Sequence, residues 1–231
     1  MSRRIAFFTI GESPRSDVVP EMALCLGEHV RIDEFGVLDG LDDAQRAALA
    51  PQAGSHRFAT RLRSGAQIQL DHHATEARLA ALMQQADDKG YDVLVPLCTG
   101  TLIPRMRSLV VEPQQVVDHH VAALSMHCTT LGLIVPLAAQ VETFALAQPV
   151  ACAVRTLHAS PYESDPVAAA AAFDAAGRAL ADCDLIVMHC MGYSQAMRER
   201  VARASGRPTL LSNRIVADAL GQLLAPTLPR E

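Results

Sequence analysis

The chain has 231 residues, of which 50% are apolar and 19% are charged, so it can bury a sizeable core and general disorder is excluded. Its formal net charge is −5 and it contains no run of Lys and Arg, which argues against nucleic acid or an anionic membrane as a partner. Aromatic residues make up only 4% and Trp is absent, which also argues against a surface that stacks on bases.

Signals for export and for membrane insertion are not recognised in the sequence. The apolar run after Arg3 and Arg4 is too short for a secretory signal, and no stretch reaches the roughly 18 apolar residues of a membrane span. Six cysteines are scattered without a CxxC pair, which is typical of reduced thiols in a protein that is not exported. We therefore expect a cytoplasmic protein that contacts no membrane.

The first half of the chain is expected to alternate strands with helices. A continuous apolar run at residues 5–10 predicts a strand that is covered on both faces. The elements expected after it are a helix at 15–26, a strand at 30–35, a short helix at 42–49, one or two minor strands up to 70, a long helix at 72–89 that ends before Gly90, and a strand at 92–97.

The second half repeats this order. Its expected elements are a helix at 112–126, a strand at 131–136, a helix at 138–147, a strand at 150–156, an alanine-rich helix at 165–181 with Asp165 as N-cap, a strand at 184–189, a helix from Ser194, a strand at 209–211 and a helix from Asn213.

Strands that alternate with helices predict an α/β fold with parallel sheets. The sequence therefore predicts two pseudo-symmetric flavodoxin-like lobes, each with a parallel four-stranded sheet, and an active site in the cleft between them. The first lobe is expected at residues 1–111 and the second at residues 112–231, with the last helix a candidate to pack back onto the first lobe.

The two halves share a motif in which an acid and an apolar strand are followed by Cys-x-Gly. It occurs at Asp92 to Gly100, with Cys98, and again at Asp184 to Gly192, with Cys190. In open parallel sheets, ligands bind beyond the carboxyl ends of the strands, where both cysteines are expected. A helix that starts beyond each cysteine is expected to point its amides at the sulfur, which favours a carboxylate ligand and a thiolate.

Two thiols on opposite sides of a substrate could invert a stereocentre, one removing a proton and the other delivering one. A single cysteine after a strand is more often a small buried hydrophobic residue, but matching positions in a repeat favour function. The other four cysteines lack this context and are expected to be structural; they are Cys25, Cys128, Cys152 and Cys183.

Further residues are expected to bind the substrate. Ser13 could donate a hydrogen bond and Arg15 could clamp a carboxylate, with a surface arginine on the first helix as the alternative. Thr99, Gly100 and Thr101 could hold a carboxylate or amide oxygen, or could cap the next helix. The full candidate set is Cys98 and Cys190 as catalytic residues, and Ser13, Arg15, Thr99, Gly100, Thr101, Pro136, Met191, Gly192, Tyr193 and Asn213 as substrate-binding residues.

Some of these residues have a structural alternative of equal or greater weight. Tyr193 could close the cleft or simply pack, and Asn213 is more typical of an N-cap. Two pairs of adjacent histidines, at 72–73 and 119–120, are expected to be exposed, and His189 is expected to pack in the core. A zinc site formed by Cys98, Cys190 and a histidine is a weaker alternative because its ligands are dispersed.

Several motifs along the chain form a specific combination: Thr9-Ile-Gly11 with Pro14-Arg15 and Asp17, Gly90-Tyr-Asp-Val, Gly132-Leu-Ile-Val-Pro136, Asp184-Leu-Ile-Val-Met, Cys190-Met-Gly192 and Leu211-Ser-Asn213. In these motifs the chain resembles the AroM family and, more distantly, the aspartate/glutamate/hydantoin racemase superfamily. The superfamily resemblance implies two lobes with one cysteine each, acting without metal or cofactor. Amino-acid racemases commonly have Asn-Thr after the first cysteine and Thr-His after the second. Here those positions hold Thr99-Gly100 and Met191-Gly192, and the second motif is more similar to that of hydantoin racemases. Both departures argue against free aspartate or glutamate as substrate.

We therefore expect a cofactor-independent racemase or epimerase that acts beside a carboxylate or carbonyl of a small acid, an amino-acid derivative or a hydantoin-like substrate. Two alternatives remain: a cis–trans isomerase or decarboxylase of a small dicarboxylate, and a non-catalytic small-molecule sensor. By analogy with related folds, a homodimer is expected. Substrate specificity is expected to depend on residues 36–65 and on the loops after the strands.

Overall fold

The computed structural model describes residues 3–52 and 54–226, and its first lobe is built on a parallel sheet with the strand order β2-β1-β5-β6. The strands are β1 (Arg3–Thr9), β2 (Val30–Gly36), β5 (Val93–Pro96) and β6 (Leu109–Val110). The last five residues of β1 are buried because helices cover both faces of the sheet, as its apolar run predicts.

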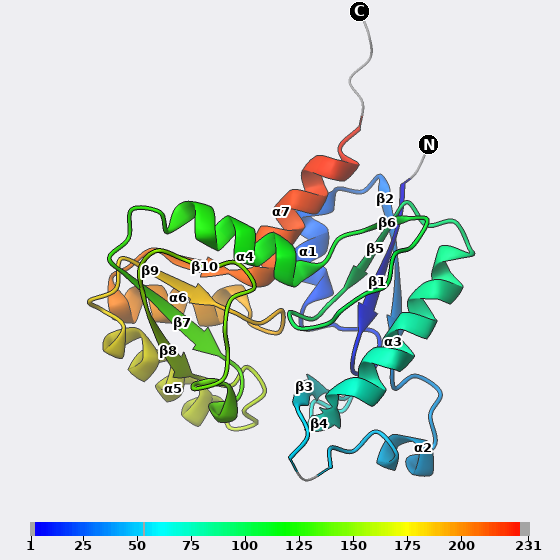
Figure 1. Cartoon of the computed structure of the whole chain (residues 1–231), viewed down its shortest axis with the longest axis horizontal. Coiled ribbons are helices and arrows are strands. Elements are labelled where there is room, and N and C mark those ends of the chain that lie inside the picture. Colours follow the sequence, from blue (N-terminus) through cyan, green and yellow to red (C-terminus); the bar gives the residue numbers. More distant parts are fainter. Residues whose placement is uncertain (1–2, 53, 227–231) are drawn as a thin grey trace, which may run out of the picture.

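The second lobe repeats this sheet strand for strand. Its strands are β7 (Thr130–Val135), β8 (Ala153–His158), β9 (Leu185–Met188) and β10 (Thr209–Leu211), in the order β10-β9-β7-β8. The strands β7, β8, β9 and β10 thus correspond to β1, β2, β5 and β6 of the first lobe. Figure 1 shows the two sheets in separate lobes. The predicted fold class is therefore confirmed.

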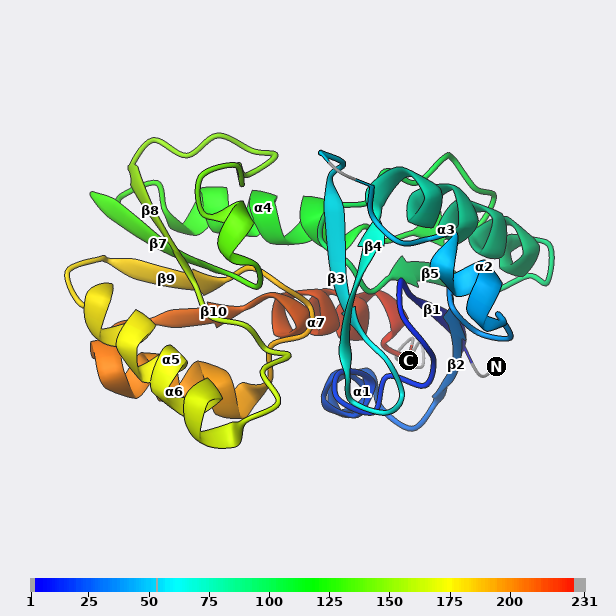
Figure 2. The same ribbon diagram turned by 90° about the horizontal axis from the view of Figure 1, so that it is seen from below.

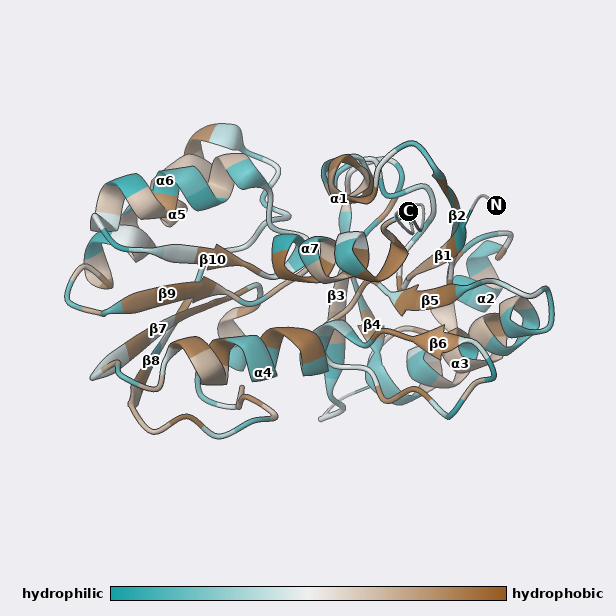
Figure 3. Ribbon diagram, turned by 90° about the horizontal axis from the view of Figure 1, so that it is seen from above, coloured by the Kyte–Doolittle hydropathy of each residue, from teal (hydrophilic) through white to brown (hydrophobic). Residues whose placement is uncertain are grey.

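Helices cover the sheets and join the lobes. They are α1 (Val19–Leu26), α2 (Asp43–Ala47), α3 (His72–Asp87), α4 (Pro113–Leu124), α5 (Pro166–Ala179), α6 (Gln195–Ser205) and α7 (Ser212–Leu224). The last helix, α7, packs against α1 and α4 between the lobes (Figure 3). A Cβ on Gly221 would lie 2.5 Å from the Cys25 carbonyl oxygen, so glycine permits the close approach of α7 to α1.

One apolar core runs through both lobes. It includes Ile5 and Phe7 of β1, Leu131 and Leu133 of β7, and Val216 of α7. Burial of these side chains is the main force that holds the lobes together. The division at residues 111 and 112 stays a prediction.

The first lobe also carries an antiparallel hairpin of β3 (Arg57–Arg61) and β4 (Gln67–Asp71) between β2 and α3. In the second lobe, the corresponding connection from β8 to α5 consists of residues 159–165, all of which the structure describes, and it contains no strand. The hairpin therefore breaks the symmetry of the repeat. It lies on the side of the first lobe that faces the second lobe (Figure 2).

Three predicted helices needed correction. Helix α1 starts at Val19 instead of residue 15, because Pro20 is tolerated only in the first turn of a helix. The helix expected at 138–147 is only a 3₁₀ turn, Ala138–Gln140, and the backbone N–H of Ala147 donates instead to Asp118, at 2.7 Å. Helix α7 starts at Ser212, so Asn213 lies inside it and is not its N-cap.

The chain after Cys98 also differs from the prediction, because residues 99–108 form an irregular loop and not a helix start. The loop leads into β6, a strand that was not predicted. It is held by Asp87, whose carboxylate accepts hydrogen bonds from the backbone N–H groups of Arg107 and Ser108 at 2.9 and 2.7 Å. Its backbone groups are thus satisfied by side chains instead of by a helix.

Candidate active site

Cys98 and Cys190 lie at equivalent places in the two lobes, each two residues beyond the carboxyl end of its strand, β5 or β9. All six cysteines of the chain lie in the described residues and are free thiols. Cys98 and Cys190 are each half-buried, and a negative charge on Cys190 raises the pKa of Cys98. The two sulfurs are therefore close enough to interact electrostatically.

Both thiols have pKa values above the ordinary range, which corrects the expectation of a helix-stabilised thiolate. For each of them, burial is the largest cause. Cys98 is followed by the irregular loop, and helix α6 starts only at Gln195, five residues beyond Cys190. Neither sulfur therefore lies directly at a helix N-terminus, and desolvation dominates.

Arg15 is a buried cation that acts electrostatically on both thiols. Its side chain is buried in the loop between β1 and α1, so the alternative of a surface arginine on a helix is wrong. Its Nε and Nη2 donate to the two carboxylate oxygens of Asp17 at 2.8 and 2.9 Å, and its Nη1 donates to Thr9 Oγ1 at 3.1 Å. The carboxylate that Arg15 clamps in the free protein is thus that of Asp17. Its positive charge lowers the pKa of both Cys98 and Cys190.

The loop that carries Arg15 is fixed by carboxylates from β2 and the chain beyond it. The backbone N–H of Arg15 donates to Glu34, at 2.7 Å. Ser13 donates from its hydroxyl and from its backbone N–H to the two oxygens of Asp39, at 2.5 and 3.0 Å. Because its hydroxyl proton is used in this way, Ser13 shapes the loop in the free protein.

Tyr162 is a site residue that the sequence interpretation missed. It is buried, follows the edge strand β8, and its Oη lies 3.8 Å from Cys190 Sγ. A Cβ on Gly192 would lie 2.5 Å from this Oη, so the glycine of the second Cys-x-Gly motif leaves room for the tyrosine. A polar aromatic residue just beyond the carboxyl end of a strand is the signal that could have indicated it.

The residues after Cys190 form a buried turn. Gly192 donates its backbone N–H to Cys190 Sγ, at 3.4 Å. Tyr193 is fully buried and donates its hydroxyl to the Ala159 carbonyl at 2.9 Å, so it packs in the core and does not close a cleft. Asn213 donates from its side-chain amide to the carbonyls of Met191 and Tyr193, at 3.2 and 2.7 Å. It therefore acts by holding the turn that positions Cys190.

The residues after Cys98 are held by the hairpin and α3. Gly100 has a φ of 155°, and its carbonyl oxygen lies 3.0 Å from Nε2 of His72. The His72 ring stacks on Phe58 of β3 with ring centroids 4.2 Å apart, so this histidine is partly buried and not exposed as predicted. Thr101 is buried and Thr99 is half-buried, and the irregular loop rules out their role as caps of a following helix.

The remaining predicted residues are packed. Pro136, just beyond β7, and Met191 are buried. His189 is buried as predicted, with Nε2 2.6 Å from Asp118 Oδ1 and its ring centroid 4.5 Å from that of Phe144. Among the described residues, no group of three or more His, Cys, Asp or Glu side chains is arranged to hold a metal ion. In the same part of the chain, no helix is long and apolar enough to cross a membrane.

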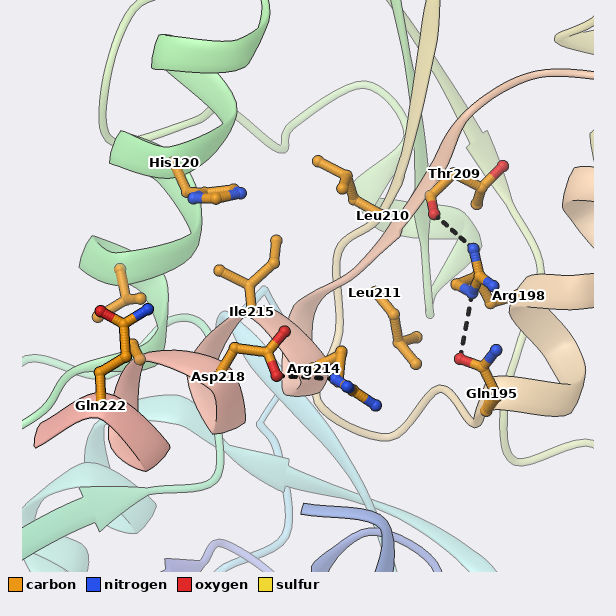
Figure 4. Close-up of a pocket in the computed structure, with 12 residues that line it drawn as sticks. His120, Gln195, Arg198, Thr209, Leu210, Leu211, Arg214, Ile215, Asp218 and Gln222 are labelled. Carbon is orange, nitrogen blue, oxygen red and sulfur yellow. Dashed lines mark hydrogen bonds and ion pairs between the residues drawn. The ribbon is translucent and has the colours of Figure 1, made fainter. Parts of the chain in front are cut away.

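A surface pocket of about 550 Å³ lies away from the thiols. It is bordered by β10, α4, α6 and α7, and His120, Arg198 and Arg214 contribute its polar lining (Figure 4). Arg198 is already bonded to Gln195, and Arg214 to Asp218. None of the predicted site residues lines it.

The two matched lobes define an Asp/Glu racemase-like fold. One similar solved structure is allantoin racemase from Klebsiella pneumoniae, with 14% identity over 97% of this chain and 88% of that chain and a TM-score of 0.59. Another is glutamate racemase from Thermus thermophilus in complex with β-chloro-D-alanine, with 17% identity over 96% of this chain and 80% of that chain and a TM-score of 0.60. A third is Picrophilus torridus aspartate racemase, with 10% identity over 98% of this chain and 96% of that chain and a TM-score of 0.60. At these identities the similarity shows the fold alone. The sequence matches the family described as AroM protein over residues 5–224, and the chain belongs to this family. No curated protein matches the chain by sequence.

Proposed function

We propose that the protein is a cofactor-independent racemase or epimerase that acts on a small substrate at a carbon next to a carboxylate or carbonyl group. The observation that carries this proposal is the pair of electrostatically coupled, free thiols, one from each lobe of the repeat. The similarity to racemase folds supports it. In this proposal each thiol serves as the acid–base group on one side of the substrate.

The chemistry needs one thiolate and one thiol. The thiolate removes the proton from the carbon and becomes a thiol, which leaves the electron pair on the substrate as an enolate. The second thiol then delivers its proton to the opposite face of the carbon and becomes a thiolate. Protons balance, and the configuration of the carbon is inverted while the two cysteines exchange their protonation states.

Arg15 supports the intermediate in this proposal. Its buried guanidinium acts on both sulfurs, and it can stabilise the negative charge that develops on the substrate oxygen. Asp17 holds the guanidinium in place through two hydrogen bonds. Such a fixed charge in a desolvated site needs little reorganisation during the reaction.

The experiment measures exchange and inversion together. Candidate substrates, including single enantiomers of 5-substituted hydantoins, N-acyl amino acids and small 2-substituted acids, are incubated in D₂O. Nuclear magnetic resonance follows loss of the α-proton and chiral chromatography follows inversion. We expect exchange with inversion, and a loss of about 10²–10⁴-fold in either Cys98→Ala or Cys190→Ala.

Cys152→Ala is the matched control, because Cys152 is also a half-buried free thiol. It should retain the wild-type rate. A Cys98→Ala/Cys190→Ala double variant that inverts a substrate as fast as the wild type would disprove the two-thiol proposal. We also propose that the protein is a homodimer, which analytical sedimentation of the same preparations tests. The free thiols support a cytoplasmic location, because disulfides are rare in that compartment.

A further inference from the structure

The two sulfurs of the site have different surroundings. Cys190 Sγ accepts the backbone N–H of Gly192 at 3.4 Å, and Tyr162 Oη lies 3.8 Å away. Each cysteine also packs against the apolar core of its own lobe. The backbone N–H of Thr99 favours a charge on Cys98 as that of Gly192 does on Cys190, so the Tyr162 hydroxyl is the side-chain donor that distinguishes Cys190. Hydrogen-bond donors stabilise a thiolate, whereas an apolar neighbourhood stabilises a thiol.

On balance, the charged and titratable groups around the pair also favour ionisation of Cys190 over that of Cys98. Those that act on Cys190 are Arg15, Asp17 and Tyr162, and those that act on Cys98 are Arg15, Glu76 and Cys190 itself. Arg15 favours ionisation of both sulfurs, so it does not distinguish them. Asp17 opposes ionisation of Cys190, but Asp17 is itself bonded to Arg15. Cys98 faces two anionic groups, Glu76 and the Cys190 thiolate, which oppose its ionisation.

We propose that Cys190 ionises before Cys98, so that Cys190 is the thiolate and Cys98 the thiol of the singly ionised pair, and that Tyr162 is the residue that stabilises the negative charge on Cys190. The catalytic meaning of this assignment rests on the proposed function, but the order of ionisation is a property of the free protein. Proton removal then begins on the face of the substrate that is turned toward Cys190.

The titration of Tyr162 is consistent with this role. Burial and the charge of Cys190 raise the pKa of Tyr162 well above its ordinary value, so the hydroxyl keeps its proton. A protonated hydroxyl beside a thiolate must be the donor of the hydrogen bond, because the thiolate has no proton to give. Gly192 matters twice, since it donates its N–H and leaves the space that Tyr162 fills.

The test is alkylation of the full-length protein by iodoacetamide without substrate, across a range of pH. Mass spectrometry of the peptides measures the rates at Cys98 and Cys190 separately. We expect Cys190 to react at lower pH than Cys98. Tyr162→Phe should slow alkylation of Cys190 about tenfold near neutral pH, which corresponds to a pKa higher by about one unit, and should not slow Cys98.

The chain offers matched controls. Tyr91→Phe removes a tyrosine hydroxyl that is bonded to Asp33 in the first lobe, and it should leave both rates unchanged. Cys190→Ser should make Cys98 react at lower pH, because the neighbouring negative charge is lost, while Cys98→Ser should leave Cys190 nearly unchanged. Comparing the ultraviolet thiolate titrations of these two serine variants gives the same order without altering Tyr162.

Two outcomes overturn the assignment: alkylation of Cys98 at lower pH than Cys190, or equal effects of Tyr162→Phe on both cysteines in a folded variant. Because no substrate is used, the result is independent of the racemase proposal. Failure to find a racemised substrate leaves the ionisation order intact, and a reversed order leaves two-thiol chemistry possible with the roles exchanged.

Discussion

The pair formed by Arg15 and Asp17 allows a sharp prediction, because one substitution should change stability and thiol reactivity in opposite directions. Asp17→Asn keeps the shape of the side chain but removes its charge. The side chain of Arg15 is 5% exposed and that of Asp17 is 22% exposed. Removing one partner of a fully buried ion pair costs about 3–5 kcal/mol, and the partial exposure of Asp17 reduces the expected loss to about 2–3 kcal/mol.

Urea denaturation followed by circular dichroism measures this loss. With a slope of about 3 kcal/mol per molar urea, the midpoint should fall by about 1 M. Asp218→Asn is the control, because its pair with Arg214 is exposed on both sides and should contribute less than about 1 kcal/mol. A loss for Asp17→Asn no larger than that for Asp218→Asn would refute the reasoning.

The destabilisation should also depend on pH. Burial acts to raise the pKa of Asp17, but its bonds to Arg15 outweigh this effect and leave the pKa below its ordinary value. A carboxylate whose pKa is lowered by folding stabilises the protein above its unfolded-state pKa of about 4, and this contribution is lost as the pH falls further. The gap between wild type and Asp17→Asn should therefore shrink in acid.

The same substitution should activate Cys190. The negative charge of Asp17 raises the pKa of Cys190, whereas Arg15 lowers it. Removing the charge of Asp17 leaves Arg15 unopposed, so iodoacetamide should alkylate Cys190 faster in Asp17→Asn than in the wild type. Slower alkylation in a variant that remains folded would contradict the proposed electrostatics.

Three further predictions concern the turns that carry the thiols. Gly192→Ala places a Cβ 2.5 Å from Tyr162 Oη, so it should lower the free energy of unfolding by about 1–3 kcal/mol, measured by urea denaturation. It should also slow alkylation of Cys190. An unchanged urea midpoint would mean that the turn relaxes freely. Asn213→Ala removes two buried hydrogen bonds and should cost about 2 kcal/mol, and a loss below about 0.5 kcal/mol would show that water replaces them. Asp87→Asn should speed hydrogen exchange in residues 99–108, because backbone N–H groups of that loop bond to the Asp87 carboxylate and hold its pKa low. For the same reason, hydrogen exchange in the wild-type loop should become faster as the pH falls and Asp87 is protonated. Unchanged exchange in the variant would mean that other contacts hold the loop.

The candidate site could be predicted only in part. The positions of Cys98 and Cys190 follow from the local pattern, because a cysteine after an apolar strand must lie at the carboxyl end of that strand. The role of Arg15 was partly foreseen, but its partner Asp17 and its burial depend on how the loop folds. Tyr162 was missed because it reaches Cys190 from the connection after a different strand, β8, and lies 28 residues earlier in the chain.

By itself, the sequence determined the repeat and most of the elements. Continuous apolar runs specify covered parallel strands, and Asp165 and Ser194 specify helix starts, because these signals act between near neighbours. The tertiary structure alone decided the electrostatics of the thiols. Whether a helix start or burial has the larger effect on the pKa of a thiol depends on groups that are distant in the chain, such as Arg15 and Tyr162 around Cys190. Desolvation is a property of the packed molecule, so the pKa values of the two cysteines rise where the local pattern predicted that they would fall.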